Sequence, residues 1–226
     1  MTPASRPHGL PFAPEALLFD MDGLMIDSER AILACWREAA VELGLSVEGD
    51  LWMRMIGLHD TDCVALMRQT LHAHEVHALQ QGCYARYHDR VDAGLPLMPG
   101  VRDVLDDVAR RALPRAVVTS TRRERATQKL ATCGLAHYFE VVVTGSDVER
   151  PKPAPEGYLK AAAALGVDPA RCVVFEDSSV GVRAALAAGM RPIQVPDLVP
   201  PDDTTRALGH RIAASLAEAY ALVALA

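Results

Sequence analysis

The chain has 226 residues, half of them hydrophobic, and a formal net charge of −6. This length allows one large domain, or one domain with a modest insertion, and enough apolar residues to build a core. The negative charge argues against a general nucleic-acid binder, which needs a positive surface to displace counterions.

Residues 1–14 are rich in proline and lack the apolar run of a signal peptide, and no segment approaches membrane-spanning length. The five cysteines are scattered, without a CxxC pair, which favours a reducing compartment over a disulfide framework. We therefore expect a cytoplasmic protein that binds neither a membrane nor nucleic acid. The sequence does not define the oligomeric state, for which a monomer is favoured.

An apolar segment, residues 16–19, ends on Asp20-Met21-Asp22-Gly23. A short apolar run bounded by turn residues is typical of a buried parallel strand, and open α/β sheets bind ligands where such strands end. In extended chain the carboxylates of Asp20 and Asp22 point the same way. Two close carboxylates cannot both ionise freely, so one pKa should rise, which suits a nucleophile or metal ligand beside a general acid and base. The alternative is a turn or helix cap that uses aspartate for local hydrogen bonds.

Apolar residues recur with helical spacing from residue 28 onward, and no convincing strand interrupts them. A passage rich in glycine and proline, residues 92–100, marks the return to the main domain. The sequence therefore predicts an α/β core of residues 1–27 and 95–226, and an inserted helical cap domain of residues 28–94.

Strands and helices alternate in the second half of the chain. Strands are predicted over residues 115–118, 139–143, 172–175 and 193–195, and an alanine-rich helix is predicted over residues 213–226. Thr121-Arg122-Arg123-Glu124 has the form of a capping box for the helix after the first of these strands. Repeated strand–helix units predict an α/β fold with a doubly wound, Rossmann-like parallel sheet and right-handed crossovers.

Polar residues follow four of the predicted strands, and parallel strands bring their carboxyl ends to one edge of a sheet. That edge would hold Asp20, Asp22, Thr119, Ser120, Lys152, Glu176 and Asp177. Carboxylates suit Mg²⁺, which takes oxygen ligands and usually keeps water and substrate phosphate. The hydroxyl pair, helix N-terminal amides and a lysine suit a phosphate group. Lys152 is one of only three lysines and lies in a loop with three prolines, so we favour a functional role over that of an ordinary solvated lysine.

Asp20-Met21-Asp22-Gly23, with Asp27, Thr119, Lys152 and Glu176-Asp177, resembles the four motifs of the haloacid dehalogenase (HAD) superfamily, in the branch with a helical cap after the first motif. The resemblance runs from about Leu17 to Val195. It implies that Asp20 attacks phosphorus to form an aspartyl phosphate, while Asp22 protonates the leaving alcohol and later activates water. It also implies Mg²⁺ held by the side chains of Asp20 and Asp177 and the backbone carbonyl of Asp22, with Glu176 nearby. Lys152 and Thr119 would then hold the phosphoryl oxygens.

Within the superfamily, Asp22 argues against dehalogenases, which do not keep this acid, and the absence of lysine from residues 28–94 argues against phosphonate cleavage. β-Phosphoglucomutases are the closer competitor, but they carry a histidine and an arginine where this chain has Ile32 and Asp60. The chain therefore resembles the broad-specificity sugar phosphatases, and its expected partner is a small phosphorylated metabolite such as a sugar phosphate. Arg54, His59 and Asp60 are the candidate specificity residues.

Three other interpretations are less favoured. A Ca²⁺ loop of EF-hand type does not fit, because Gly23 stands fourth in the segment rather than sixth. His72, His74 and His77 lack the four-residue spacing of a zinc-protease helix. A family member that only binds phosphorylated ligands is disfavoured because all the motif residues are present.

Overall fold

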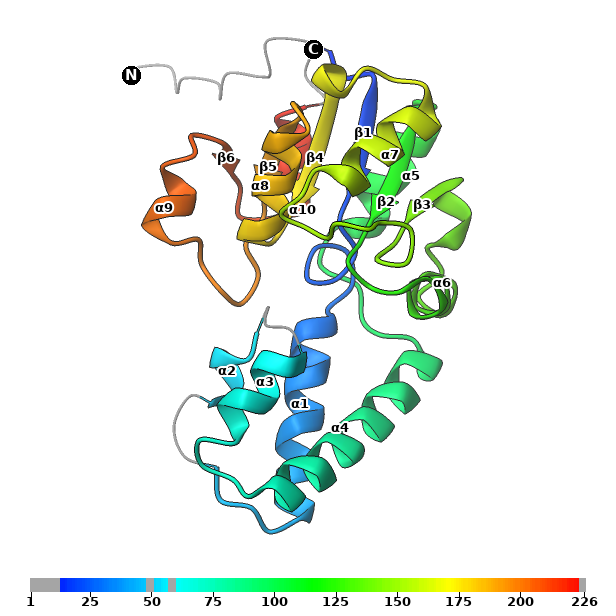
Figure 1. Ribbon diagram of the computed structural model, residues 1–226. Coiled ribbons are helices and arrows are strands. Elements are labelled where there is room, and N and C mark those ends of the chain that lie inside the picture. Colours follow the sequence, from blue (N-terminus) through cyan, green and yellow to red (C-terminus); the bar gives the residue numbers. More distant parts are fainter. Residues whose placement is uncertain (1–12, 48–50, 57–59, 224–226) are drawn as a thin grey trace, which may run out of the picture.

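Two groups of elements make up the structure, a sheet covered by helices and a smaller unit of helices alone (Figure 1). The structure is a computed structural model and describes residues 13–47, 51–56 and 60–223. None of the helices in these ranges is both long enough and apolar enough to cross a membrane.

The sheet has six strands, all parallel to their neighbours, in the order β3-β2-β1-β4-β5-β6. They are β1 (Ala16–Phe19), β2 (Arg115–Val118), β3 (Val141–Val143), β4 (Cys172–Glu176), β5 (Arg191–Gln194) and β6 (Arg211–Ile212). The strand order reverses at β1, which pairs with β2 on one side and β4 on the other. This confirms the predicted doubly wound sheet, and it places the crevice where such folds bind ligands beside the end of β1.

Helices cover both faces of the sheet. One face carries α5 (Val101–Arg110), α6 (Arg123–Thr132) and α10 (Leu216–Ala221), and the other carries α7 (Glu156–Leu165) and α8 (Ser179–Ala187). The remaining pieces of this unit are α9 (Asp203–Arg206) and the 3₁₀ helices η1 (Ala136–Tyr138) and η2 (Pro169–Arg171).

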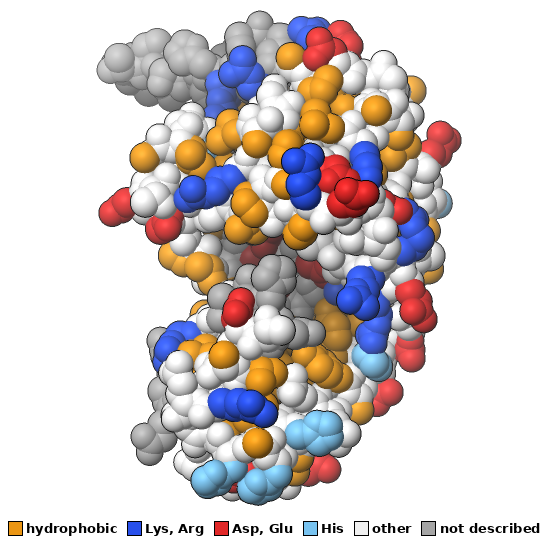
Figure 2. Space-filling model, in the orientation of Figure 1, with side chains coloured by type: hydrophobic (Ala, Val, Ile, Leu, Met, Phe, Trp, Pro, Cys, Tyr) orange, Lys and Arg blue, Asp and Glu red, His pale blue; other side chains and the backbone are white. Residues whose placement is uncertain are grey.

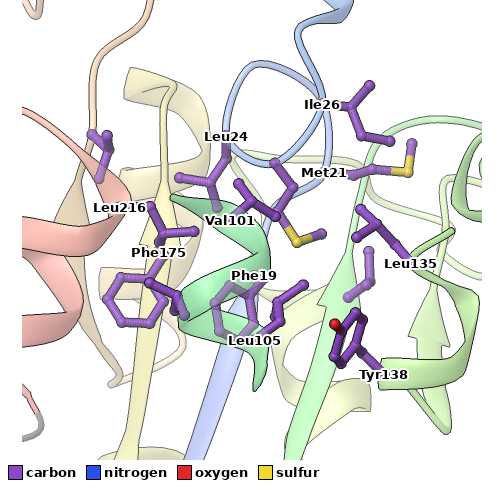
Figure 3. Packing of buried hydrophobic residues seen from close by; sticks show 14 of the residues in the cluster. Phe19, Met21, Leu24, Ile26, Val101, Leu105, Leu135, Tyr138, Phe175 and Leu216 are labelled. Atoms are coloured by element: carbon purple, nitrogen blue, oxygen red, sulfur yellow. The ribbon is translucent and has the colours of Figure 1, made fainter. Parts of the chain in front are cut away.

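Successive side chains of β1 point to opposite sides of the sheet, and all four are buried because helices cover both faces. Leu17 and Phe19 face the α5 side, where the Phe19 ring lies 5.9 Å from that of Phe139 and 5.1 Å from that of Phe175. Figure 3 shows Phe19 and Phe175 in this cluster. Leu18 joins the second cluster, under α7 and α8. This packing fixes the end of β1, and with it Asp20, between two layers of helices.

The helical unit contains α1 (Ser28–Glu42), α2 (Leu51–Arg54), α3 (Asp60–Met67) and α4 (Ala73–Ala93). It has its own apolar core, in which the rings of Trp36 and Trp52 stack 6.1 Å apart. Helix α4 continues through Ala93, so the linker begins later than the predicted residue 92. The domain boundaries at residues 28 and 94 stay a prediction.

Two chain segments join the units, and they are tied to each other. Ile26 forms an antiparallel bridge with Leu97, and the flanking backbone hydrogen bonds run from Asp27 N to Pro96 O and from Met98 N to Met25 O, each 2.9 Å. The helical unit is thus attached through a short two-stranded connection rather than through two independent linkers.

Several local predictions are wrong. The third strand begins at Val141 rather than at residue 139. In place of the helix predicted over residues 213–226, the described residues form the short α10, which β6 precedes, and residues 224–226 lie outside the described part. The capping box is absent, because Arg122 is the N-cap of α6 and no side chain caps it. The hydroxyl of Thr121 is used elsewhere, as described below.

Candidate active site

The turn after β1 brings two loops into close contact. Gly23 has a φ of +78°, which glycine adopts at little cost. A Cβ at Gly23 would overlap Asp177 Oδ2 and lie 3.0 Å from its Cγ, so the missing side chain allows Asp177 to approach. Asp20 continues the strand pairing through its N–H, which donates to Phe175 O at 3.0 Å, and it is only 7% exposed. The acids after β1 and β4 therefore face one small space.

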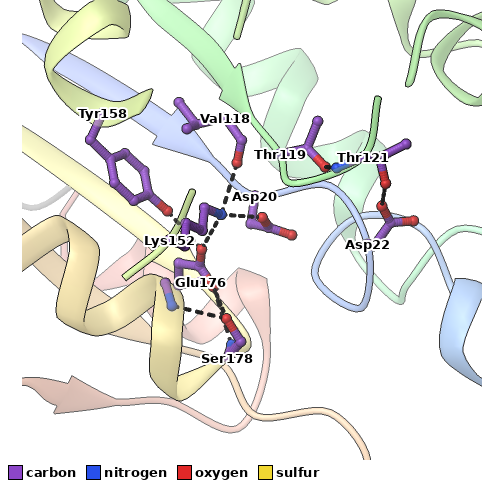
Figure 4. Close-up of polar contacts among 10 residues, drawn as sticks. Asp20, Asp22, Val118, Thr119, Thr121, Lys152, Tyr158, Glu176 and Ser178 are labelled. Carbon is purple, nitrogen blue, oxygen red and sulfur yellow. Dashed lines mark hydrogen bonds and ion pairs between the residues drawn. The ribbon is translucent and has the colours of Figure 1, made fainter. Parts of the chain in front are cut away.

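Lys152 is the centre of a buried polar cluster at this edge of the sheet (Figure 4). Its Nζ donates to Asp20 Oδ1 and to Glu176 Oε1, each at 2.5 Å, and to Val118 O at 3.0 Å. Glu176 is fully buried and accepts a second hydrogen bond on Oε1 from the Tyr158 hydroxyl at 2.7 Å. One ammonium group thus serves two carboxylates and a carbonyl, and its three acceptors fix its position.

The other oxygen of Glu176 is held by the loop before α8. Oε2 accepts from Ser178 N at 3.1 Å and from Ser178 Oγ at 2.9 Å. Gly181, in the first turn of α8, packs so closely that an added Cβ would overlap all three atoms of the Glu176 carboxyl group. Glu176 therefore has a fixed orientation and acts on Lys152 rather than facing solvent.

Asp22 has a separate pair of donors. Its Oδ1 accepts from Lys129 Nζ at 2.6 Å, and its Oδ2 accepts from Thr121 Oγ1 at 2.7 Å. Neither donor is predicted from the sequence. For Lys129, the sequence does contain a signal that this side chain is buried, because it lies on the apolar face of α6, between the buried residues Ala126 and Leu130.

Thr119 and Ser120 lie at the end of β2, on the same edge of the sheet as Asp20 (Figure 4 labels Thr119). Thr119 is 5% exposed, and its hydroxyl accepts from Thr121 N at 3.1 Å. Ser120 is exposed, and a Cβ on the neighbouring Gly145 would overlap its carbonyl oxygen. Both predicted residues therefore follow β2, Thr119 buried and Ser120 exposed, and their binding of phosphate stays a prediction.

Burial raises the pKa values of two carboxyl groups, those of Asp20 and Asp177. Burial raises the pKa of Asp20 to about 7; Lys152 opposes this rise and the charge of Glu176 adds to it. Burial also raises the pKa of Asp177 well above its ordinary value, and Asp20 adds to that rise. Two buried carboxylates that share too little positive charge are a donor set that fits a hard divalent cation.

Asp22 differs because it has an ammonium group of its own. Burial raises its pKa, but the Lys129 charge and hydrogen bond outweigh that effect and hold the pKa below its ordinary value. On α1, burial and then the charge of Asp22 raise the pKa of Glu29 to about 7. One of the two motif aspartates therefore does have a raised pKa, as expected, but it is Asp20 rather than the residue expected to donate a proton.

A metal site of three or more His, Cys, Asp or Glu side chains is not found among the described residues. The predicted set has a different composition, with the side chains of Asp20 and Asp177 and a backbone carbonyl. This magnesium site stays a prediction.

The candidate specificity residues belong to the helical unit. Arg54 is exposed at the end of α2, and Asp60 begins α3, but its side chain and the whole of His59 lie outside the described part. In Figure 2 the surface is indented where the two units meet, and histidines gather at the opposite end of the helical unit. There the rings of His72 and His74 stack 5.9 Å apart, at the start of α4, remote from the sheet.

Known proteins are similar to this chain in both sequence and fold. Residues 17–195 match the model of a family described as haloacid dehalogenase-like hydrolase. A phosphorylated carbohydrates phosphatase of Thermotoga maritima is 35% identical over 183 residues, or 79% of this chain and 83% of that protein. The fructose-1-phosphate phosphatase YqaB of Escherichia coli is 34% identical over 183 residues, or 79% of this chain and 95% of that protein. A crystal structure of a HAD family hydrolase from Deinococcus radiodurans, with bound phosphate and sodium, superposes with a TM-score of 0.78 at 30% identity and covers 94% of this chain and 96% of that one.

Proposed function

The chain belongs to the haloacid dehalogenase-like hydrolase family, and from this membership we propose that it is a phosphatase that hydrolyses the phosphate monoester of a small phosphorylated sugar. The named relatives act on phosphorylated carbohydrates, and the similar crystal structure holds a phosphate. The fold and the enzyme class expected from the sequence are thus supported at the level of the family.

The observation that carries the proposal is that Asp20 and Asp22, only two residues apart, form ion pairs with different lysines. Asp20 lies at the strand end with Lys152 at 2.5 Å, an ammonium that it shares with Glu176. Asp22 has its own ammonium, Lys129, at 2.6 Å. A nucleophile and a proton carrier need different environments, and this arrangement supplies two.

In the proposed first step, a carboxylate oxygen of Asp20 attacks phosphorus while the bond to the leaving oxygen breaks. Asp22 is ionised in the free protein, and the negative charge of a bound phosphate would raise its pKa so that it takes up a proton from water. It then transfers that proton to the leaving oxygen, so the sugar leaves as an alcohol and an aspartyl phosphate remains. Thr119 and Ser120 are proposed to donate hydrogen bonds to the phosphoryl oxygens, and Lys152, beside Asp20, is proposed to stabilise by its positive charge the negative charge that develops in transfer.

In the proposed second step, Asp22 takes a proton from water, and the resulting hydroxide attacks the aspartyl phosphate to release inorganic phosphate and regenerate Asp20. The side chains of Asp20 and Asp177 and the carbonyl of Asp22 would hold Mg²⁺, which supplies positive charge to the transferring group. Because Asp20 attacks only when ionised, its raised pKa explains why a cation there would favour activity at neutral pH.

The helical unit is proposed to act as a cap domain, with residues 28–94 inserted into a core of residues 1–27 and 95–226. Its position beside the carboxyl ends of the strands supports a role in substrate selection (Figure 1). Arg54 is the described candidate for contact with the sugar, because its side chain is exposed and charged.

A β-phosphoglucomutase-like activity is the second candidate. It would need an additional polar group on α1 near the matching position, where Ile32 instead packs against the apolar core of the helical unit. The packing of Ile32 therefore favours hydrolysis over transfer to a second sugar hydroxyl.

The test is phosphate release from a panel of sugar and other phosphomonoesters, with and without Mg²⁺. We expect release that depends on Mg²⁺ and falls to background in Asp20→Asn, while Asp103→Asn, an exposed aspartate on α5, keeps full activity. Failure on every substrate would refute the proposal and leave a protein that only binds phosphorylated ligands. Full activity in Asp20→Asn would refute the proposed reaction through an aspartyl phosphate on Asp20. Interconversion of hexose 1- and 6-phosphates with a bisphosphate activator would establish the mutase instead.

A further inference from the structure

The side chain of Lys129 lies next to the proposed acid and base, yet it comes from the middle of α6 rather than from a strand end. We infer that Lys129 is a positioning residue that holds the Asp22 carboxyl group in the orientation needed to protonate the leaving alcohol. This inference rests on the proposed function, because it assigns Asp22 a fixed partner in that reaction.

The contacts of Asp22 restrict its rotation. Lys129 Nζ donates to Oδ1 at 2.6 Å, and Thr121 Oγ1 donates to Oδ2 at 2.7 Å, so each carboxylate oxygen has a donor from a different place in the fold. Hydrogen bonds to a charged group are short and strong, and two donors, one on each oxygen of a carboxylate, fix the plane of the group. A proton donor is effective only when it reaches the leaving oxygen in the correct geometry.

Lys129 itself is fixed by both units of the structure. Its side chain is 7% exposed, and its Nζ lies 5.3 Å from the centre of the Tyr87 ring, which belongs to α4 of the helical unit. A cation over an aromatic ring is attracted to the ring face. Burial alone would lower the pKa of Lys129, but Asp22 outweighs it and keeps the pKa above its ordinary value, so the side chain stays charged. A buried lysine with so few conformations is suited to hold another group in place.

An ion pair that only stabilises the fold makes a different prediction from a positioning residue. Loss of a purely structural contact changes the rate for all substrates to the same extent. Loss of correct proton donation affects a substrate with a poor leaving group, such as an alkyl phosphate, and leaves one with a good leaving group nearly unchanged. 4-Nitrophenyl phosphate is the second kind, because 4-nitrophenol is far more acidic than an alcohol.

The experiment compares kcat/KM for 4-nitrophenyl phosphate and for an alkyl phosphate that the wild type hydrolyses, at saturating Mg²⁺. This parameter reports the first step, in which the leaving group departs. For Lys129→Met we expect a loss of about 100-fold on the alkyl phosphate, at the lower end of what general acid catalysis contributes, and a loss below about 3-fold on the aryl phosphate. Asp22→Asn should show the same pattern, and the double variant should lose no more than Asp22→Asn alone. Lys160→Met is the matched control, because Lys160 is 47% exposed on α7 and pairs only on the surface.

Equal losses on both substrates, no loss on the alkyl phosphate, or additive losses in the double variant would each overturn the inference while the phosphatase function stands. A wild type that releases no phosphate from any ester overturns the proposed function and this inference with it. Circular dichroism and thermal unfolding verify that the variants fold. If Lys129→Met does not fold, Lys129→Gln, which is polar but uncharged, takes its place with the same expected pattern.

Discussion

Replacement of Gly181 by alanine should destabilise the protein, although alanine is the better helix former. Gly181 lies in the first turn of α8, where helix propensity alone favours alanine by about 0.8–1 kcal/mol. A Cβ at this position would overlap the carboxyl group of Glu176, which is buried and already holds Lys152. The two effects have opposite signs, so the measured sign decides between them.

The magnitude follows from the contacts that Glu176 would lose. Its carboxylate pairs with Lys152 at 2.5 Å and accepts hydrogen bonds from Tyr158 and Ser178. Separation of one partner from a buried ion pair costs about 3–5 kcal/mol, so the net loss after the gain in propensity is about 2–4 kcal/mol. Displacement of Glu176 would also release Lys152 from one of its partners. We therefore expect a lower kcat, because Lys152 is proposed to stabilise the phosphoryl group.

Urea denaturation of wild type and Gly181→Ala measures this loss as a lower midpoint with an unchanged slope. The control is the same substitution in a Glu176→Ala background, where no carboxyl group occupies the space. There Gly181→Ala should stabilise the protein by about 1 kcal/mol. A Gly181→Ala protein as stable as the wild type, or one equally destabilised in both backgrounds, would show that the contact with Glu176 is not the cause.

Three further predictions concern the same edge of the sheet. Gly23→Ala should weaken Mg²⁺ binding in a titration, because its Cβ would displace Asp177. Gly44→Ala is the control: Gly44 has a similar φ of +63° but open space around it, so this substitution should cost backbone strain of about 1–2 kcal/mol and leave the Mg²⁺ affinity unchanged. Equal Mg²⁺ affinities of the two variants would contradict this prediction. Because the folded pKa of Asp20 is about 7, above its unfolded value, the folded state binds more protons and its stability without metal falls as pH rises toward 7. Mg²⁺ should therefore raise Tm more at about pH 8 than at about pH 5.5, and equal shifts would argue against binding at Asp20. Lys152→Met should lower the free energy of unfolding by about 3–5 kcal/mol in urea at about pH 8, and less at about pH 5.5, where Asp20 is protonated; a loss independent of pH would be inconsistent with the Lys152–Asp20 pair.

Much of the fold could be predicted because the parallel strands are short continuous apolar runs. β1 and β4 are buried on both faces, so their sequences are apolar at every position until the chain reaches the site. The polar residues at these strand ends stand out for the same reason. This contrast between buried run and polar end is a local property, and local properties can be read from a sequence.

The sequence-based predictions are wrong where one side chain can make either of two physically reasonable contacts. Thr121 could cap α6 or donate to a distant carboxylate, and the sequence does not distinguish these because both satisfy its hydroxyl. Phe139 looks like part of a strand, but its ring packs on Phe19 while the backbone closes a 3₁₀ turn. Lys129 was overlooked because a lysine on a helix is normally solvated, and only the tertiary structure places Asp22 opposite it.

The paired connection between the two units has a mechanical consequence. A domain attached by one flexible linker can rotate about that point in any direction. Here two connecting segments are joined by the Ile26–Leu97 bridge, so the helical unit can rotate mainly about the line through both segments. This motion is a hinge rotation, and it changes the separation of the two units most at the points farthest from the axis. Lys129 and Asp22 both belong to the unit that contains the sheet, so such a rotation of the helical unit would leave their ion pair in place while it changes the contact of Tyr87 with Lys129.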